Sequence, residues 1–451
     1  MKKKILCLAL CVIMVFASLV GCEEENRKDI MNKIGKDASE GALTVTMYLL
    51  SEKAVSAEQE KLVEDAVNEY MDDYNVRLDL VYKTEADYYT DLEKNLAMMI
   101  TKAAEEKANK KNQNKETAAV TGESGEATEA ATQAATEAPI ETDENGNPKY
   151  LYIDENGLPI VYYPPNPDYH VDIFYFSGYE RYQQYKAAGY FADFSSPIKD
   201  TNAKNIKHGV STVFYDGVKT LNSKYDMMPC NTQVGEYTYL LLNKEALTSA
   251  QYTADKVSNL ADGNCAAFLE LIKNYYPEYV PLYSTEATLP TELSAYTAVA
   301  ETDKPFAVGY VKGDIALREE YAEDYEVVVL ENPKLEKEAL YEHALAISSY
   351  TKQKNTTALV LSVIYTNEAV INLLAHGIEG TNYTWVDSDV RDENYELYKV
   401  VKPIAEEEKY TYVIDPSTIG NSALVYPTVD DNPKRTENIL KQNSEASPVT
   451  K

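Results

Sequence analysis

The chain has 451 residues and a formal net charge of −30 at pH 7. A protein this acidic is repelled by the phosphates of nucleic acids, so no nucleic-acid partner is expected. Hydrophobic residues make up 44% of the sequence. A chain of this length and composition is expected to build two domains or lobes, each with a core of its own.

The first 22 residues have the layout of a bacterial secretory signal. Three lysines precede an apolar run from Ile5 to Val20, which is too short for a typical membrane span. The run ends in Leu-Val-Gly-Cys, which resembles a lipobox and implies removal of residues 1–21 and acylation of Cys22, for example by palmitate. An ordinary signal cut elsewhere, or an uncleaved anchor, is the alternative. Residues 22–42 would then form a tether between the lipid and the folded body.

Two cysteines remain once the signal is removed and Cys22 is acylated. They are Cys230 and Cys265, and their separation in sequence says nothing about their distance in space. A disulfide and two isolated buried thiols therefore both stay open.

The body opens with a strand–helix–strand–helix pattern. Residues 44–50 form an apolar, β-prone run, and Ser56 is expected to cap a helix whose apolar residues continue to Tyr74 at helical spacing. Residues 75–83 alternate as in a half-buried strand. A second helix is predicted from about Ala86 to Lys107.

An insertion interrupts this pattern over about residues 108–168. Between 108 and 142 large apolar residues are almost absent, so the segment cannot bury enough surface to offset its chain entropy and is predicted to be disordered. Two Asp-Glu-Asn-Gly turns, at Asp143 and Asp154, then alternate with strand-like segments. This pattern predicts a surface hairpin.

The alternation of strands and helices resumes at Val171. A buried strand leads into Ser177-Gly178-Tyr179, and Gly189 ends the helix that follows. Strands alternating with helices predict parallel α/β sheets with helices on their faces. Further strands are predicted near 237–242, 280–283, 306–311 and 325–331, and further helices near 266–276, 335–346 and 355–375.

Taken together, several segments resemble the extracellular solute-binding proteins of ABC importers, specifically the sugar-type lipoproteins of Gram-positive bacteria. The segments are, in order, the lipobox, "EQEKLVEDAVNEYMDDYNVRLDL", "VDIFYFSGYERYQQYKAAGYFADFSSPI", "GEYTYLLLNKEAL", "ALAISSYTK", "TNEAVINLLAHGIEGTNYT" and "YVIDPSTIGNSALVYP". The resemblance covers roughly residues 43–430. It implies an α/β, two-lobed, periplasmic-binding-protein-like (type II) fold that closes around a solute in a cleft between the lobes.

The resemblance also implies how the chain is divided. Residues 43–235 would form mainly the first lobe, 236–390 mainly the second, and 391–451 would return to the hinge or the first lobe and end in a tail. The family usually continues with more helices beyond the segment near Ser447. A truncated or divergent short form is therefore expected.

Candidate ligand-binding residues follow from the predicted strand ends. Ligands of doubly wound sheets lie beyond the carboxyl ends of strands, and sugars need aromatic faces and a few hydrogen-bonding groups. Tyrosines are numerous, 38 in all, so packing in a core is the alternative for each. The candidates by position are Ser51, Ser177, Gly178, Tyr179, Asn231, Glu236 and Tyr237, and the family's motifs add Tyr350 and Asn421.

Catalysis has little support in the sequence. The four histidines are far apart and lack metal-ligand spacing, and the acids are too numerous to identify a glycosidase pair. No catalytic residue, cofactor or metal is expected. The implied function is capture of an oligosaccharide on the extracellular face of a Gram-positive cell membrane and its delivery to ABC permease subunits. Alternatives are a non-transporting glycan binder or sensor partner and, less favoured, a surface glycan-processing enzyme.

The segment from Leu374 to Trp385 holds the only tryptophan of the chain. Gly377 is placed as the glycine just beyond a helix end, and Gly380 allows a second turn before a short strand with Tyr383. Trp385 is expected either to pack against the preceding helix or to lean towards the cleft.

Overall fold

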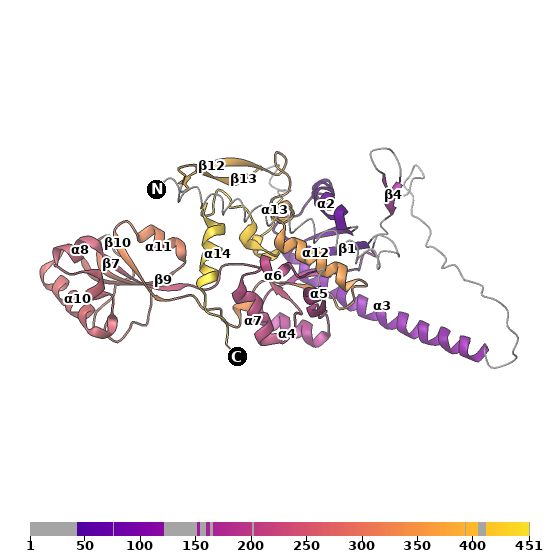
Figure 1. The fold of residues 1–451 in the computed structure, drawn as a ribbon, viewed down its shortest axis with the longest axis horizontal. Helices are drawn as coiled ribbons and strands as arrows, with labels where there is room; N and C mark the ends of the chain where they lie inside the picture. Colours follow the sequence, from indigo (N-terminus) through magenta and orange to yellow (C-terminus); the bar gives the residue numbers. More distant parts are fainter. Residues whose placement is uncertain are drawn as a thin grey trace, which may run out of the picture.

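The structure is a computed structural model of the whole chain. It describes residues 43–74, 76–120, 151–153, 159–162, 166–200, 203–392, 394–404 and 412–450. The signal, Cys22 and the tether lie outside these residues. Figure 1 shows two α/β bodies side by side, with helix α14 (Arg435–Glu445) between them and helix α3 (Glu85–Val120) projecting from the larger body.

The first lobe is built on a five-stranded sheet in the order β2-β1-β5-β11-β6. Strand β1 pairs in parallel with β2 and β5, whereas β11 runs antiparallel to both β5 and β6. Side chains on both faces of β5 and β11 are buried, which explains why these two strands are continuous apolar runs, whereas the edge strand β2 alternates. The strands are β1 (Leu43–Ser51), β2 (Val76–Thr84), β5 (Ile173–Phe176), β11 (Ala344–Ile347) and β6 (Met228–Pro229).

Helices cover both faces of this sheet and close one large core with it. The first of them begins as predicted, because the Ser56 side chain accepts a hydrogen bond from the Gln59 amide at 3.3 Å. The α-helices are α2 (Ala57–Met71), α3, α4 (Tyr179–Ala188), α5 (Ser195–Asp200), α6 (Ile206–Gly209), α7 (Thr212–Asn222), α12 (Lys354–Thr366) and α13 (Glu368–His376). Short 3₁₀ turns are η2 (Asp72–Tyr74), η4 (Ala339–Tyr341), η5 (Pro416–Thr418) and η6 (Ser422–Leu424).

The second lobe is built on a four-stranded sheet in the order β10-β7-β9-β8. Strand β7 (Tyr237–Asn243) is buried on both faces, with Leu240 and Leu242 in one core and Tyr239 and Leu241 in the other. The other elements are β8 (Val280–Ser284), β9 (Phe306–Gly313), β10 (Tyr325–Glu331), α8 (Lys244–Ser249), α9 (Ala254–Val257), η3 (Leu260–Asp262), α10 (Asn264–Tyr275) and α11 (Ile315–Tyr321).

The two sheets and their separate cores confirm the two-lobed α/β fold class. The expectation of parallel sheets is wrong for the second lobe, where β7 is antiparallel to both neighbours and only β8 and β9 are parallel. The physical reason is the connection. Helix α11 packs on one face and connects β9 to β10, which therefore run in the same direction, and β7, which enters from the first lobe between them, runs the opposite way.

The chain crosses between the lobes twice before α14. It leaves the first sheet after β6, enters the second at β7, and comes back after β10 to form β11. The predicted helix near 335–346 is therefore wrong: this stretch holds η4 and strand β11 in the middle of the first sheet. A short apolar run buried on both sides has no period that separates strand from helix. The return to the first lobe thus begins well before residue 391.

The insertion differs from its prediction at its start. Helix α3 continues to Val120, so the part of the predicted disordered segment that the structure describes, 108–120, is helical. Its composition explains this, since Ala, Lys, Glu and Gln favour a helix even without an apolar face. The predicted hairpin is confirmed by β3 (Leu151–Ile153) and β4 (Pro159–Tyr162), which pair antiparallel. The rest of the segment lies outside the described residues.

The two cysteines left open by the sequence are free thiols in different cores. Cys230 belongs to the core of the first lobe and Cys265 to a core of the second. Burial raises the pKa of each thiol to about 12. Both are therefore small buried apolar residues, and the disulfide is excluded.

The segment around Trp385 has the predicted helix–turn–strand form. Helix α13 ends at His376 and Gly377 follows with φ +74°, before β12 (Tyr383–Arg391) pairs with β13 (Leu397–Pro403). The Trp385 ring lies 5.8 Å from that of Tyr383 and 4.9 Å from that of Tyr426. It packs within the base of the β12–β13 hairpin and against Tyr426.

No single helix within the described ranges is both long and apolar enough to cross a membrane. Helices α12 and α13 meet these criteria only as a pair bent by 84°.

Candidate functional site

The strands of the first sheet bring distant residues to one rim. Strands β1, β5 and β6 all end there, and β11 begins there because it runs the opposite way. Ser51, Ser177, Asn231 and His343 therefore lie at the same rim, here called the carboxyl rim. Both crossing segments to the second lobe attach at this rim, so it is the part of the first sheet directed towards the second lobe.

A tyrosine–histidine pair lies at the carboxyl rim. Tyr175 Oη and His343 Nδ1 are 2.8 Å apart, and the two rings stack at 6.0 Å. Burial raises the pKa of the Tyr175 hydroxyl well above its usual range, so this group stays protonated and acts as a donor or acceptor. The pair places the half-buried imidazole of His343, the residue before β11, against the buried phenol of Tyr175 on β5.

The turn after β5 is shaped by a glycine. Gly178 has φ +93° and caps α4, and its amide donates to the Tyr341 carbonyl at 2.7 Å. A Cβ at Gly178 would meet no atom within 4 Å, so space is open above the backbone here. Lys337 Nζ lies 4.3 Å from the centre of the Tyr179 ring, and its hydrogen bond lowers the pKa of Tyr179.

A second cation lies on an aromatic ring near the same turn. Arg181 Cζ is 3.5 Å from the centre of the Tyr89 ring, and Nη1 donates to the Ser177 carbonyl at 3.3 Å. Stacking of this kind holds the guanidinium in place while leaving other N–H groups free to donate. The turn after β5 thus carries two cation–aromatic pairs.

The loop before η5 completes the rim. Ile414 bridges to Ser51 at the end of β1, and the Ser51 hydroxyl donates to the Val413 carbonyl at 3.3 Å. In the same loop the Asp415 carboxylate accepts from the Ser417 amide at 2.8 Å. The Ser417 hydroxyl is buried and has no hydrogen-bond partner among the described residues, which is uncommon for a buried polar atom.

Two predicted asparagines serve the fold. Asn231 Nδ2 donates to Asn421 Oδ1 at 2.9 Å, and Asn421 Nδ2 donates to the Tyr365 carbonyl at 2.9 Å. Asn231 Oδ1 accepts from the Ser211 amide at 3.0 Å. Both side chains are buried, so they hold the start of the first crossing segment and leave little for a ligand.

Glu236 and Tyr237, the two candidates at the end of the first crossing segment, lie in different environments. Tyr237 is buried, stacks on Tyr239 at 5.3 Å, and donates its hydroxyl to Glu445 of α14 at 3.0 Å. Glu236 beside it is exposed. Glu236 therefore stays in contact with solvent, whereas Tyr237 joins the second lobe to α14.

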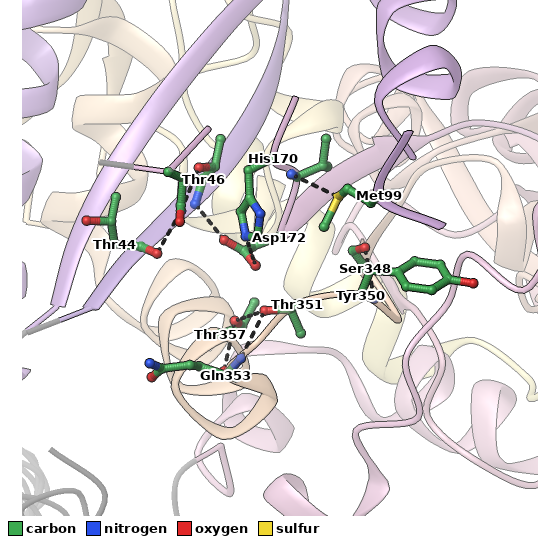
Figure 2. A network of polar contacts seen from close by, with 12 residues as sticks. Thr44, Thr46, Met99, His170, Asp172, Ser348, Tyr350, Thr351, Gln353 and Thr357 are labelled. Atoms are coloured by element: carbon green, nitrogen blue, oxygen red, sulfur yellow. Dashed lines mark hydrogen bonds and ion pairs between the residues drawn. The ribbon is translucent and has the colours of Figure 1, made fainter. Parts of the chain in front are cut away.

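Tyr350 lies away from the other candidates. It follows the end of β11, and because β11 is antiparallel to β5 this end lies at the opposite rim. Figure 2 shows Tyr350 next to Ser348, near a polar network in which Asp172 accepts from the Thr46 amide at 2.9 Å and pairs with His170 at 3.0 Å. The Tyr350 ring points away from this network (Figure 2).

The structure therefore gathers Ser51, Ser177, Gly178 and Tyr179 at one rim and adds residues that sequence reasoning missed. The additions are Tyr175, Arg181, His343 and Ser417. Tyr175 and His343 are 168 positions apart, and no local pattern links them. The only sequence signal was their position at the ends of apolar runs. Among the described residues no group of three His, Cys, Asp or Glu side chains is arranged to hold a metal ion.

No protein-family model matches the sequence, and no curated protein matches it at a significant level. Solved structures similar to the chain include the N-glycan transport solute binding protein NgtS from Streptococcus pneumoniae, with 15% identity and a TM-score of 0.43 over 89% of this chain and 83% of that one. That protein has also been solved with Man5GlcNAc.

Two further similar structures come from other bacteria. One is an extracellular solute-binding protein of family 1 from Alicyclobacillus acidocaldarius, with 10% identity and a TM-score of 0.38 over 91% of this chain and 88% of that one. The other is an extracellular solute-binding protein from Bifidobacterium longum subsp. infantis, with 10% identity and a TM-score of 0.40 over 90% and 82%. At these values the similarity concerns the general arrangement of the chain and says nothing about its ligand.

Proposed function

We propose that this protein is a solute-binding protein that holds a carbohydrate between its lobes, on the carboxyl rim of the first sheet. The observation that carries the proposal is the Tyr175–His343 pair at the rim where both crossing segments attach. The buried Tyr175 orients the half-buried imidazole of His343, which offers a hydrogen bond and part of a flat face to a sugar at the rim.

Neighbouring groups at the rim suit the same ligand. Arg181 and Lys337 are oriented by the rings of Tyr89 and Tyr179, and the unpartnered Ser417 hydroxyl adds a further donor and acceptor. A site with a few oriented polar groups among aromatic faces favours an oligosaccharide over an apolar solute.

The proposed cellular role rests on the sequence alone. The signal-like first 22 residues with Cys22 support a lipid-anchored protein on the extracellular face of the membrane. Such a protein would pass its sugar to ABC permease subunits, which with their partners hydrolyse ATP. The role is binding, so sugar should be recovered unchanged.

Calorimetric titration of residues 43–451 with a panel of oligosaccharides tests the binding. Tyr175→Phe should weaken affinity for the best ligand about fivefold to tenfold, because one hydrogen-bonding group is lost. Tyr350→Phe removes the same group at the opposite rim and should leave affinity unchanged. Equal effects of the two variants, or a panel in which no sugar binds, would exclude the proposed site. Appearance of cleaved products would exclude a purely binding role.

A further inference from the structure

A polar concavity lies outside the carboxyl rim. It has a volume of about 670 Å³ and is formed by the turn between β12 and β13 and by the first turn of α14. Figure 1 shows the β12–β13 hairpin above α14, on the side of the molecule where α11 lies. The residues lining it are Arg391, Asp392, Asn394, Tyr398, Lys434 and Glu437.

Hydrogen bonds join the described residues of the hairpin turn to one another. Asp392 accepts from the amides of Asn394 at 2.8 Å and Glu396 at 2.9 Å, and Arg391 Nη1 donates to the Tyr395 carbonyl at 2.6 Å. Hydrogen bonds from the Asn394 and Glu396 amides also lower the pKa of Asp392. The carboxylate therefore stays ionised and keeps the turn closed.

This turn presents an aromatic ring in a strained backbone. Tyr395 has φ +65°, a conformation that favours glycine or asparagine, and its side chain is 81% exposed. Neither the strain nor the exposure helps folding, since glycine or asparagine would fit the turn better and would expose less apolar surface. Backbone strain of this kind clusters at active sites and ligand-binding sites.

The concavity is also attached to the second lobe. Tyr398 donates to Glu437 of α14 at 2.9 Å, and Lys434, the N-cap residue of α14, pairs with Glu319 of α11 at 2.8 Å. Its floor thus runs from the hairpin through α14 to the second lobe. A ligand here would lie beside the junction of the two lobes.

We propose that the concavity and the Tyr395 ring together bind a pyranose unit of a glycan chain, as a peripheral subsite separate from the carboxyl rim. The lining holds two cations and two carboxylates, so it has no net charge to attract a phosphate or another anion. Alternating donors and acceptors suit vicinal hydroxyl groups instead, and Tyr395, which is outside the lining but follows Asn394 and accepts from Arg391 through its carbonyl, offers an exposed aromatic face on the same turn. The inference rests on the proposed function in that the ligand is a carbohydrate.

The test uses Tyr395→Asn, because asparagine tolerates the left-handed conformation and should keep or raise the melting temperature. Affinities for disaccharides and for longer chains of the same malto-, cello- and manno-oligosaccharides are measured by calorimetry. Tyr395→Asn should weaken binding of the longer chains about tenfold, with disaccharide affinity unchanged. Tyr275→Asn, at an exposed tyrosine of the second lobe, is the matched control and should change neither.

Unchanged affinity of Tyr395→Asn for every chain length would overturn the subsite. An equal loss for short and long chains would also overturn it, because the ring would then belong to the main site. A failure of the proposed main site would give a different result. Tyr175→Phe would then leave disaccharide affinity unchanged, while Tyr395→Asn would still weaken binding of the longer chains. If no oligosaccharide binds at all, both the subsite and the carbohydrate assignment are wrong.

Discussion

Tyr175 on β5 and His343 at the start of β11 are joined side chain to side chain at 2.8 Å, although 168 positions separate them in the chain. Between them the chain builds the second lobe and comes back. Their contact therefore exists only when the returning segment has entered the first sheet as β11. It links the candidate site directly to the completion of the first lobe.

A double-mutant cycle on this pair measures the contact. Tyr175→Phe and His343→Ala, each alone and together, should show a coupling free energy of about 0.5–1.5 kcal/mol in urea unfolding, typical of one hydrogen bond between neutral groups. Tyr350→Phe combined with His343→Ala is the control pair from the opposite rim. Additive effects of Tyr175→Phe and His343→Ala would contradict the contact.

Glu64 on α2 should make stability depend on pH. Burial raises the pKa of its carboxyl to about 7, against which the hydrogen bond from the Leu80 amide at 3.0 Å acts only in part. The folded state thus holds this proton more tightly than the unfolded chain, whose value is about 4.3. The contribution of Glu64 to stability is therefore fully present below about pH 4.3 and is lost as pH rises towards 7.

Glu64→Gln removes this dependence and keeps an oxygen for the Leu80 amide. The difference in unfolding free energy between the variant and the unchanged protein should grow by about 1–2 kcal/mol, in favour of the variant, from pH 5 to pH 8. This is less than the full pKa shift would give, because the side chain is partly exposed. Glu69→Gln, at an exposed position of the same helix, serves as control. If Glu64→Gln changed stability equally at both pH values, the pKa of the Glu64 carboxyl would not be raised in the folded protein.

Gln442 of α14 should be important for the union of the lobes. Its side chain is fully buried, donates to the carbonyls of Val234 and Gly235 at 2.9 and 2.6 Å, and accepts from the Ile315 amide of the second lobe at 3.0 Å. Gln442→Met keeps the shape and removes all three bonds. We expect a loss of about 2–4 kcal/mol, because buried backbone groups lose their partners.

Differential scanning calorimetry checks this prediction. The single unfolding transition should move to lower temperature and begin to separate into two, one for each lobe. Lys441→Met introduces the same residue at the neighbouring exposed position of α14 and should leave the transition where it is. A Gln442→Met protein as stable as the Lys441→Met protein would refute the role of the side chain.

Two glycines after α13 should respond differently to alanine. Gly377 has φ +74°, and a Cβ there would lie 2.5 Å from Asn382 Oδ1, the atom that accepts from the Ile378 amide. Gly380 has φ +77° with nothing within 4 Å of its Cβ position. Gly380→Ala should therefore cost only the conformational strain of about 1–2 kcal/mol. Gly377→Ala should cost at least about 1 kcal/mol more in urea unfolding. Equal costs would contradict the close approach.

Short-range features of the sequence determined the helices and strands that carry part of the candidate site. Ser56 capped α2 as expected, the alternation after residue 75 formed β2, and Gly189 and Gly377 ended helices as predicted. These features depend on a few neighbouring residues, on side-chain period and on backbone conformations that glycine alone adopts readily. The strand ends at Ser51 and Ser177 followed from them, and so did the part of the rim that these residues form.

Only the tertiary structure decided the rest of the site. The short apolar run at Ala344–Ile347 has no distinguishing period, and its antiparallel place between β5 and β6 brings His343 to the rim and takes Tyr350 to the opposite one. Likewise Asn231 and Asn421 are ligand-like in sequence, yet both are buried, where Asn231 donates to Asn421 and Asn421 donates to the Tyr365 carbonyl. Such outcomes depend on which distant segments pair and on which polar groups lose water, and neither is encoded in any short stretch of residues.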